Sequence, residues 1–597
     1  MEDNRIGKRL EALREVMRRE KIDAFIFPST DPHNGEYVPA RWEGRKWISG
    51  FDGSAGVAVV TMQKAALWTD SRYFIAAEQQ LEGTEYRLMK ERMEGTPSIA
   101  EWLGMALAHV DGAVVGLDGM VNPAAEVEQL AAELRRQGGI TLRTNFDPLQ
   151  LIWTDRPAVP EGAVEIHPMQ YAGETAQSKL QRIRRELKRC GAEGMLVSAL
   201  DDIAWTLNMR GSDVHCNPVF VAYLLIDGEH TTIYINKVKL QPQVADYLKG
   251  IGVEVREYAE VADGLAHYGS YNILLDPMQT CHTLFRAARC PEVVRRQSPV
   301  PTLKSVKNEA EIQGFRNAML RDGVAMVKFL HWLRPAVEKG GQTEISVSRE
   351  LERLRSQQEG FRGVSFDTIA AYQEHGAIVH YEATPETDVE LKPEGFLLLD
   401  SGAQYLDGTT DITRTIALGP VSEEQRHVYT LVLKGHIQIE LCKFPNRASG
   451  TQLDILARQA MWREGMNYMH GTGHGVGSYL NVHEGPHQIR MEWKPAPLVS
   501  GMTVTDEPGI YLAGKFGVRI ENTLLVADYM QTDFGKFLQF DSLTLCPIDL
   551  ECADLTMLSA EEKQWLNEYH NIVYDRLSPH LSAQECSWLK EKTRGIS

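Results

Sequence analysis

The chain has 597 residues, of which 43% are hydrophobic and 24% charged, as in an ordinary globular protein. Its formal net charge of −18 argues against nucleic acid as a partner, because phosphate backbones repel an acidic protein. The sequence has no apolar run of about 18 residues, and its first residues are charged where a signal peptide needs an apolar core. We therefore expect no membrane partner and a cytoplasmic location, where the eight scattered cysteines stay free thiols.

A unit of helix, short apolar strand and aspartate-bearing loop occurs twice, at residues 9–31 and again at residues 179–202. Each copy continues into strand-like runs, which lie at residues 57–61, 65–69, 219–226 and 231–235. Proline-marked polar segments follow each copy and are expected to be linkers. The repeat predicts two related α/β domains, over residues 1–150 and 151–303.

The remaining residues, 304–597, alternate helices with strands and are predicted to form a third domain. A long helix is expected over about residues 307–333. Near the end of the chain, Ser559 and Glu562 have the spacing of a capping box. Apolar residues with helical spacing follow this box, namely Trp565, Leu566, Tyr569, Ile572, Val573 and Leu577. We expect a C-terminal helical extension over about 555–597, packed on its own subunit or on a partner.

Two acids of the third domain, Asp400 and Asp411, lie in strand-like runs on either side of the turn-forming pair Asp407-Gly408. Asp400 follows three leucines, so we expect it to be partly buried, and burial of an unpaired carboxylate is costly unless a cation is near. The alternative is a surface hairpin with acids that cap turns, which suits Asp407 but not Asp400. A strict two-residue turn would pair Asp400 with Thr415, so a shared metal site requires a wider or bulged loop.

A stretch rich in histidine and glycine covers residues 470–487. Its four histidines are His470, His474, His483 and His487. The run His483-Glu484-x-x-His487 has the spacing of a zinc-protease helix, but we reject that interpretation. The motif needs both histidines on one helical face, and Pro486 between them would cost a helix roughly 3 kcal/mol and one hydrogen bond.

Two further strand-like runs, residues 504–509 and 517–522, carry a third group of charged residues. Glu507 precedes a proline, which favours an extended backbone at this position. Arg519 and Glu521 are two residues apart and are expected to share one face of a strand. The structural alternative is an Arg-Glu pair on an exposed strand.

Together the three clusters offer two aspartates, at least one histidine and two glutamates. Oxygen donors with one imidazole suit divalent ions such as manganese, cobalt or zinc. Four carboxylates are too many for one closed zinc site, but they suit two metals that share bridging carboxylates.

These clusters resemble the metal motifs of the pita-bread metallopeptidases, and most closely the aminopeptidase P branch (Xaa-Pro aminopeptidases, family M24B) in its long three-domain cytosolic form. The runs that carry the resemblance are residues 400–411, 470–477, 506–509 and 519–522, with residues 68–74, 210–220 and 376–381. The resemblance implies an α/β (α+β) fold, in which two related N-terminal α/β domains of the creatinase N-terminal type precede a pita-bread catalytic domain.

The resemblance also implies a role for each site residue. The metal ligands would be Asp400, Asp411, His474, Glu507 and Glu521. Asp411 and Glu521 would bridge both ions, and Glu507 would also act as general base. The other two catalytic residues would be His380, which stabilises the oxyanion, and His483, which lies near the scissile bond.

The substrate-binding residues implied by the resemblance are Arg72, His380, His470, His483 and Arg519. Arg72 would reach substrate from the first domain, although an ordinary ion pair with Asp70 is the alternative. His375 departs from the family pattern, because it lies in a segment where many relatives carry a small Gly/Asn-rich loop. Its role is left open.

The implied reaction is hydrolysis of the first peptide bond in peptides with proline second. It would use two divalent ions per subunit, with Mn²⁺ preferred and Zn²⁺ or Co²⁺ as alternatives. We expect a homodimer whose third domains form the main contact, since the apolar face of the C-terminal helix needs a covering surface. Three alternatives stay open: an Xaa-Pro dipeptidase of the prolidase type, a creatinase-like hydrolase without metals, and a non-catalytic pita-bread binding module. The two front domains argue against the dipeptidase, and the complete ligand set argues against the other two.

Overall fold

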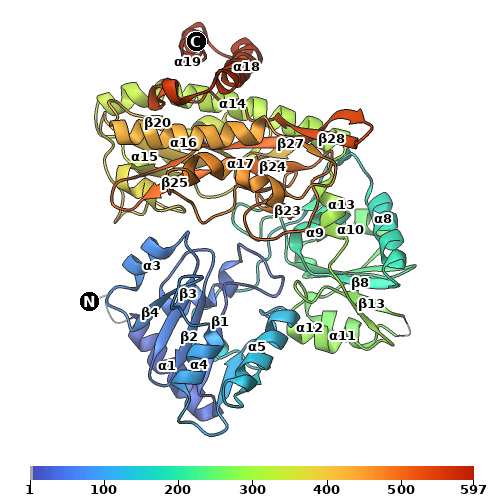
Figure 1. Cartoon of the computed structure of the whole chain (residues 1–597). Coiled ribbons are helices and arrows are strands. Elements are labelled where there is room, and N and C mark those ends of the chain that lie inside the picture. The colour runs from blue at the N-terminus through green and yellow to red at the C-terminus, as the bar shows by residue number, and fades with distance from the viewer. Residues whose placement is uncertain (1–4, 270) are drawn as a thin grey trace. The chain divides into compact units, whose positions relative to one another are not determined.

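The computed structural model describes residues 5–269 and 271–597, which are shown in Figure 1. The chain divides into two compact units, one of Met1–His167 with Thr175–Val300 and one of Pro168–Glu174 with Pro301–Ser597. Over the described residues, no helix is long and apolar enough to cross a membrane. The eight cysteines are free, as predicted.

The first unit contains two six-stranded sheets. The first has the order β4-β3-β2-β1-β5-β6, with strands β1 (Ala24–Phe27), β2 (Val57–Thr61), β3 (Ala65–Thr69), β4 (Tyr86–Lys90), β5 (Val114–Leu117) and β6 (Thr141–Arg143). The second has the order β12-β11-β10-β8-β13-β14, with strands β8 (Gly194–Val197), β10 (Ala222–Ile226), β11 (Thr231–Ile235), β12 (Val253–Arg256), β13 (Ile273–Leu275) and β14 (Val293–Arg295).

The two sheets share their pairing directions as well as their strand order. In each, the central strand, β1 or β8, is antiparallel to one neighbour and parallel to the other. The outer pairs on each side are parallel in both sheets. The predicted repeat of two related α/β folds is therefore confirmed.

Helices surround these sheets because their apolar stripes need a partner surface. In α1, for example, Leu10, Leu13 and Met17 are buried in one cluster with Phe25 and Phe27 of β1. The helices of the unit are α1 (Arg5–Glu20), α2 (Gly44–Ser49), α3 (Phe74–Leu81), α4 (Ile99–Ala106), α5 (Ala124–Arg136), α6 (Leu149–Ile152), α8 (Ala176–Arg189), α9 (Leu200–Leu207), α10 (Pro242–Gly250), α11 (Val261–Ala266) and α12 (His282–Ala287). A small sheet pairs β7 (Glu165–Ile166) with β9 (Met209–Arg210).

The second unit is built on short sheets that surround the acids and histidines of the sequence motifs. Its strands are β15 (Phe361–Val364), β16 (Ile369–Tyr372), β17 (Phe396–Ser401), β18 (Ala403–Tyr405), β19 (Gly408–Thr409), β20 (Ile412–Ala417), β21 (Lys443–Pro445), β22 (Gly473–Gly475), β23 (Glu484–Ile489), β24 (Thr503–Asp506), β25 (Gly509–Leu512), β26 (Phe516–Arg519), β27 (Asn522–Thr532) and β28 (Gly535–Ser542). They form the sheets β16-β17-β20, β21-β28-β27-β24 and β15-β18-β19, and the pairs β22-β23 and β25-β26.

Long helices cover this unit. They are α14 (Glu309–Glu338), α15 (Glu344–Ser356), α16 (Glu423–Glu440), α17 (Gly450–Trp462), α18 (Ala560–Leu577) and α19 (Ala583–Lys592), beside the short α7 (Met169–Ala172) and α13 (Val300–Ser305). Asn308 and Glu311 form a capping box at the start of α14. This helix runs past its predicted end, with Pro335 inside its last turns, where one lost hydrogen bond is tolerated.

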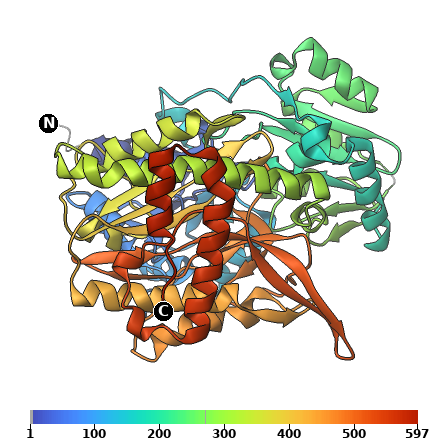
Figure 2. The same cartoon turned by 90° about the horizontal axis from the view of Figure 1, so that it is seen from above.

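The C-terminal helices lie on their own chain. Figure 2 shows α18 and α19 crossing α14, and both helices contact it. The predicted capping box of Ser559 and Glu562 starts α18. Of the predicted apolar face, Leu566, Tyr569, Val573 and Leu577 are buried in the core, whereas Ile572 is 53% exposed. Most of this face is therefore covered within the subunit.

Candidate metal centre

The register of the β17–β20 hairpin brings Asp400 and Asp411 together. Asp400 faces Thr413 across the sheet. The inner strands pair Tyr405 with Gly408, so the turn consists of Leu406 and Asp407. The expected turn at Asp407-Gly408 is therefore wrong by one residue, and the pairing of Asp400 with Thr415 that a strict turn there would impose does not form. The shift of the turn by one residue moves the register by two, so no bulge is needed to place Asp411 near Asp400.

Glu507 and Glu521 lie opposite each other in an interrupted ladder. β24 pairs Asp506 with Asn522, and β25 pairs Gly509 with Arg519, in one continuous register. The expectation that both glutamates lie within strands is wrong, because each occupies a two-residue link between strands. The ladder breaks here because Pro508 has no N–H to donate. Continued through the break, the register sets the two carboxylates face to face.

His474 on β22 completes the group. Its Nδ1 lies 2.9 Å from the carbonyl oxygen of Gly475, so Nδ1 carries the proton and donates. Its Nε2 then carries no proton, and it lies 3.5 Å from Asp411 Oδ2 and 3.6 Å from Glu507 Oε1. One donor atom each from Asp411, His474 and Glu521 lie within 4.8 Å of one another. This is the spacing of ligands around a shared ion.

The electrostatics of the group call for cations. The pKa values of Asp411, Glu507 and Glu521 are raised well above those of ordinary carboxyl groups. The main cause is burial, and the second is repulsion from neighbouring carboxylates. Asp400 Oδ1 is buried with no hydrogen-bond partner among the described residues. Divalent ions would offset this repulsion and satisfy the orphaned oxygen, so the residues present fit a metal centre.

Arg519 joins the metal group to a tyrosine that our sequence reasoning missed. Its Nη2 donates to Asp400 Oδ2 at 2.6 Å, and its Nη1 donates to the Tyr511 hydroxyl at 2.7 Å. The alternative of an exposed Arg519-Glu521 pair is wrong, because Arg519 is buried and bonds to Asp400. Tyr511 also lies 2.8 Å from His470 Nε2. No spacing rule marked Tyr511, since the contact forms only when β25 pairs with β26.

The other predicted histidines lie around this group. The ring of His483 stands 4.4 Å from that of His474, nearly perpendicular to it. His380 follows Val379, whose carbonyl lies 3.4 Å from Arg519 Nη2. The run from Glu484 to Ile489 is strand β23, so the rejection of a zinc-protease helix is confirmed. His487 is fully buried, with Nε2 2.7 Å from the Thr503 carbonyl.

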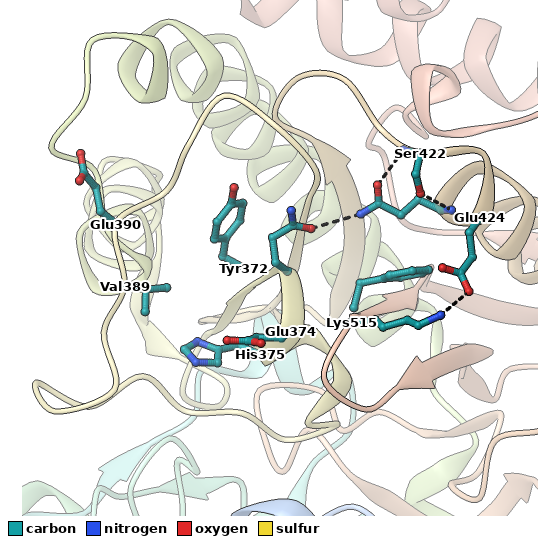
Figure 3. A pocket seen from close by; sticks show the side chains of 11 residues that line it. Tyr372, Glu374, His375, Val389, Glu390, Ser422, Glu424 and Lys515 are labelled. Atoms are coloured by element: carbon teal, nitrogen blue, oxygen red, sulfur yellow. Dashed lines mark hydrogen bonds and ion pairs between the residues drawn. The ribbon is translucent and has the colours of Figure 1, made fainter.

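His375 has a structural partner away from the metal group. It lies in a 3-10 turn, Gln373–Ala377, and its Nδ1 is 2.9 Å from the buried Glu344 carboxylate, a hydrogen bond that raises the pKa of His375. Its ring stacks on Tyr381 at 4.4 Å. Figure 3 shows it in an open pocket with Tyr372 and Val389. The role left open for His375 is thus answered in part by a buried anchor for this turn.

Arg72 belongs to the first unit and pairs with Asp70, the ordinary ion pair considered above. Arg72 Nε and Nη2 lie 2.9 and 2.7 Å from the two carboxylate oxygens of Asp70. The guanidinium also lies 5.3 Å from the centre of the Tyr73 ring. This arrangement fixes the side chain at the end of β3, and its contact with substrate stays a prediction.

A second buried group lies behind the metal group and was also missed. His436 of α16 has Nδ1 3.0 Å from Asp506 Oδ2, and Glu440 accepts from the Asn522 side chain at 2.8 Å. Asp506 and Asn522 are the sequence neighbours of Glu507 and Glu521. A buried polar layer therefore supports both links, but the isolated His436 gave no signal in the sequence.

Comparison with known proteins assigns the chain to a family. Residues 9–145 and 155–311 match the creatinase/prolidase N-terminal domain, residues 313–528 match metallopeptidase family M24, and residues 536–596 match the C-terminal region of peptidase M24. Aminopeptidase P1 of Arabidopsis thaliana is 37% identical over 98% of this chain and 99% of its own length. This chain belongs to the aminopeptidase P branch of metallopeptidase family M24.

Other aminopeptidases match this chain over its whole length, whereas a dipeptidase of known structure matches only part of it. Xaa-Pro aminopeptidase 1 of Dictyostelium discoideum is 38% identical over 99% of this chain and 97% of its own length. The X-prolyl aminopeptidase of Caenorhabditis elegans, described as a cytosolic enzyme with a di-nuclear active site, matches with a TM-score of 0.93 and 33% identity, over 99% of this chain and 100% of that one. The Xaa-Pro dipeptidase of Bacillus anthracis reaches a TM-score of 0.51 and 26% identity, over 63% of this chain and 99% of its own. The predicted family and fold class are confirmed.

Proposed function

We propose that this chain is a dinuclear metal-dependent Xaa-Pro aminopeptidase, which hydrolyses the first peptide bond when proline is second. The observation that carries the proposal is the gathering of three carboxylates, those of Asp411, Glu507 and Glu521, around the ring of His474, in a chain similar to aminopeptidases over its whole length. Because the Caenorhabditis elegans enzyme is described as cytosolic, we also propose a cytoplasmic location.

The proposed metal ligands are Asp400, Asp411, His474, Glu507 and Glu521. Bound divalent ions would lower the pKa of a water molecule and polarise the substrate carbonyl. Asp411 and Glu521 are proposed to bridge, since one donor atom of each lies within 4.8 Å of the other and of His474. The oxygen-rich donor set supports Mn²⁺ as the preferred ion, with Zn²⁺ and Co²⁺ as alternatives.

Glu507 is proposed as the general base. It is half-buried, whereas Asp400, Asp411 and Glu521 are buried, so it is the carboxylate of the group most open to an incoming water molecule. A carboxylate at this edge of the group is placed to accept the proton of a water molecule that the ions would activate.

The remaining residues are proposed to handle substrate. His380 donates to the oxyanion that develops on the scissile carbonyl. His483 contacts the peptide near that bond, from its place beside the His474 ring. His470, Arg519 and Arg72 complete the proposed substrate-binding set. Through its bond to Asp400, Arg519 also keeps that ligand oriented.

The test is to incubate the purified full chain with an Xaa-Pro-Xaa tripeptide and with the matching Xaa-Pro dipeptide, each with and without Mn²⁺. We expect release of the first residue from the tripeptide, dependent on Mn²⁺, and little from the dipeptide. Faster cleavage of the dipeptide would favour the prolidase alternative. If the protein bound Mn²⁺ but cleaved neither peptide, it would be a binding module.

A further inference from the structure

Arg414 of β20 carries a buried positive charge directly behind the metal group. Its side chain is 1% exposed. Its hydrogen bonds reach the carbonyls of Thr413, Glu521, Cys546 and Pro547, the side-chain oxygen of Asn522 and the hydroxyl of Tyr569. Among the described residues, none of these bonds ends on a carboxylate, although a buried charge is normally paired with one.

The guanidinium fixes the peptide that carries Glu521. Arg414 Nη1 donates to the Glu521 carbonyl at 2.6 Å and to the Thr413 carbonyl at 3.0 Å. The Thr413 carbonyl also accepts from the Glu521 N–H at 3.0 Å, and the Thr413 hydroxyl donates to Glu521 Oε2 at 2.9 Å. Since Glu521 lies in a link outside the strand ladder, these bonds replace the constraint that a strand would provide.

The C-terminal helix α18 reaches this arrangement through Tyr569. The Tyr569 hydroxyl accepts from Arg414 Nη2 at 3.0 Å and lies 3.0 Å from the carbonyl oxygens of Thr544 and Cys546. Its ring is buried and stacks on Trp565, with centroids 5.2 Å apart and planes 6° apart. The phenol ring therefore has little freedom to move, and its hydroxyl fixes the position of Arg414 Nη2.

We propose that Tyr569 is a positioning residue that acts through Arg414 on Glu521, so that the C-terminal region supports the metal centre. This inference rests on the proposed role of Glu521 as a metal ligand. Partners of a ligand fix its orientation, and removing one typically lowers metal affinity or activity by about 10- to 100-fold. Tyr569 contacts Glu521 only through Arg414. Removal of its hydroxyl should therefore lower the metal affinity by an amount near the lower limit of this range, about 10-fold.

The experiment is a calorimetric titration of metal-free full-length protein with Mn²⁺, in the wild type, Tyr569→Phe and Arg414→Lys. We expect the Mn²⁺ affinity to fall by about 10-fold in Tyr569→Phe and by up to about 100-fold in Arg414→Lys, which cannot form the same fork of bonds. Peptide cleavage by Tyr569→Phe should need more Mn²⁺ to reach its maximum, with KM for the peptide unchanged.

Two control variants on α18 distinguish an effect on the metal centre from a general loss of fold stability. Tyr574→Phe removes a hydroxyl for which the described structure shows no partner, and Val573→Ala removes buried methyl groups. Both should bind Mn²⁺ like the wild type, while Val573→Ala lowers the melting temperature. If Tyr569→Phe also binds like the wild type, or if Val573→Ala weakens binding equally, the support role is wrong. If the wild type binds no Mn²⁺, the metal-centre proposal itself fails.

Discussion

Glu521 is the single residue whose loss should damage the metal centre most. It faces Glu507 across the broken ladder and shares a ligand cluster with Asp411 and His474. We expect Glu521→Gln to abolish turnover and loosen metal binding, because a bridging carboxylate neutralises charge on two ions at once. Metal content by mass spectrometry and the cleavage rate check this. Glu562→Gln, a buried carboxylate on α18, is the matched control and should keep both ions. Wild-type metal content and rate in Glu521→Gln would remove Glu521 from the bridge.

His483 tests the distinction between ligand and substrate contact. Its ring touches that of His474, but it is absent from the cluster of donor atoms. We expect His483→Ala to keep its metals and to lose about 10²-fold or more in rate, the contribution of one acid–base or transition-state contact. Metal content by mass spectrometry and the cleavage rate check this prediction. A parallel fall in metal occupancy would make His483 a ligand instead.

The environment of Asp31, in the loop that follows β1, leads us to expect a pH effect on stability. Its Oδ1 accepts from the N–H groups of His33 and Gly35, while Oδ2 is buried with no partner among the described residues. Burial raises the pKa of Asp31 from 3.8 to about 6. Between these values the folded chain holds a proton that the unfolded chain has lost. This stabilisation, about 3 kcal/mol, is therefore complete below pH 3.8 and is lost as the pH rises through about 6.

The variant Asp31→Asn keeps an oxygen acceptor but cannot ionise. We expect it to unfold at a higher urea concentration than the wild type at pH 8, and by a clearly smaller margin at pH 5, where part of the wild-type stabilisation remains. Urea unfolding at both pH values measures this. An equal shift at the two pH values would show that Asp31 does not titrate in this range.

At the scale of elements, the site depends on where regular structure stops. The strand predictions at residues 57–61, 65–69 and 231–235 agree with β2, β3 and β11, because runs of buried β-branched and apolar residues need no distant partner to identify them. The prediction of one strand-like run over residues 517–522 was confirmed at 517–519 and at 522 but wrong at the two-residue link between β26 and β27. Its pattern is continuous, and the break at Glu521 comes from Pro508 on the facing strand, which a reading of one segment alone does not include.

The close contact between strand β26 and the 3-10 turn Gln373–Ala377 leads to a further prediction. Gly517 of β26 passes the 3-10 turn Gln373–Ala377, where a Cβ on Gly517 would lie 1.7 Å from the Gly376 carbonyl oxygen. We expect Gly517→Ala to push this turn away and to lower the free energy of unfolding by about 1–3 kcal/mol. Since the turn leads directly to His380, the rate should fall more than the metal content.

Urea unfolding, metal content and peptide cleavage together check the Gly517→Ala prediction. Gly228→Ala is the control, because nothing lies within 4 Å of the added carbon there. Wild-type stability and rate in Gly517→Ala would mean that the turn yields without cost and does not hold His380.

At the scale of the whole molecule, the assembly is still a prediction. Most of the apolar face of α18, which suggested a partner, is buried within the chain, so this face no longer argues for a dimer. From the family resemblance we still expect a homodimer. Light scattering on active protein should then give twice the chain mass of 67.1 kDa. A mass near 67.1 kDa at full activity would show that one chain is sufficient.

The sequence by itself determined the fold class, the repeat of two front domains, the family and the candidate ligands. These features rest on local periodicity and on motifs of adjacent residues, and both can be read along one strand or loop. Only the tertiary structure decided the shifted turn beside Asp407, the break opposite Pro508, and the contacts of Tyr511, Arg414 and Tyr569. These are contacts between residues far apart in the chain, and their register and burial exist only after the strands have paired.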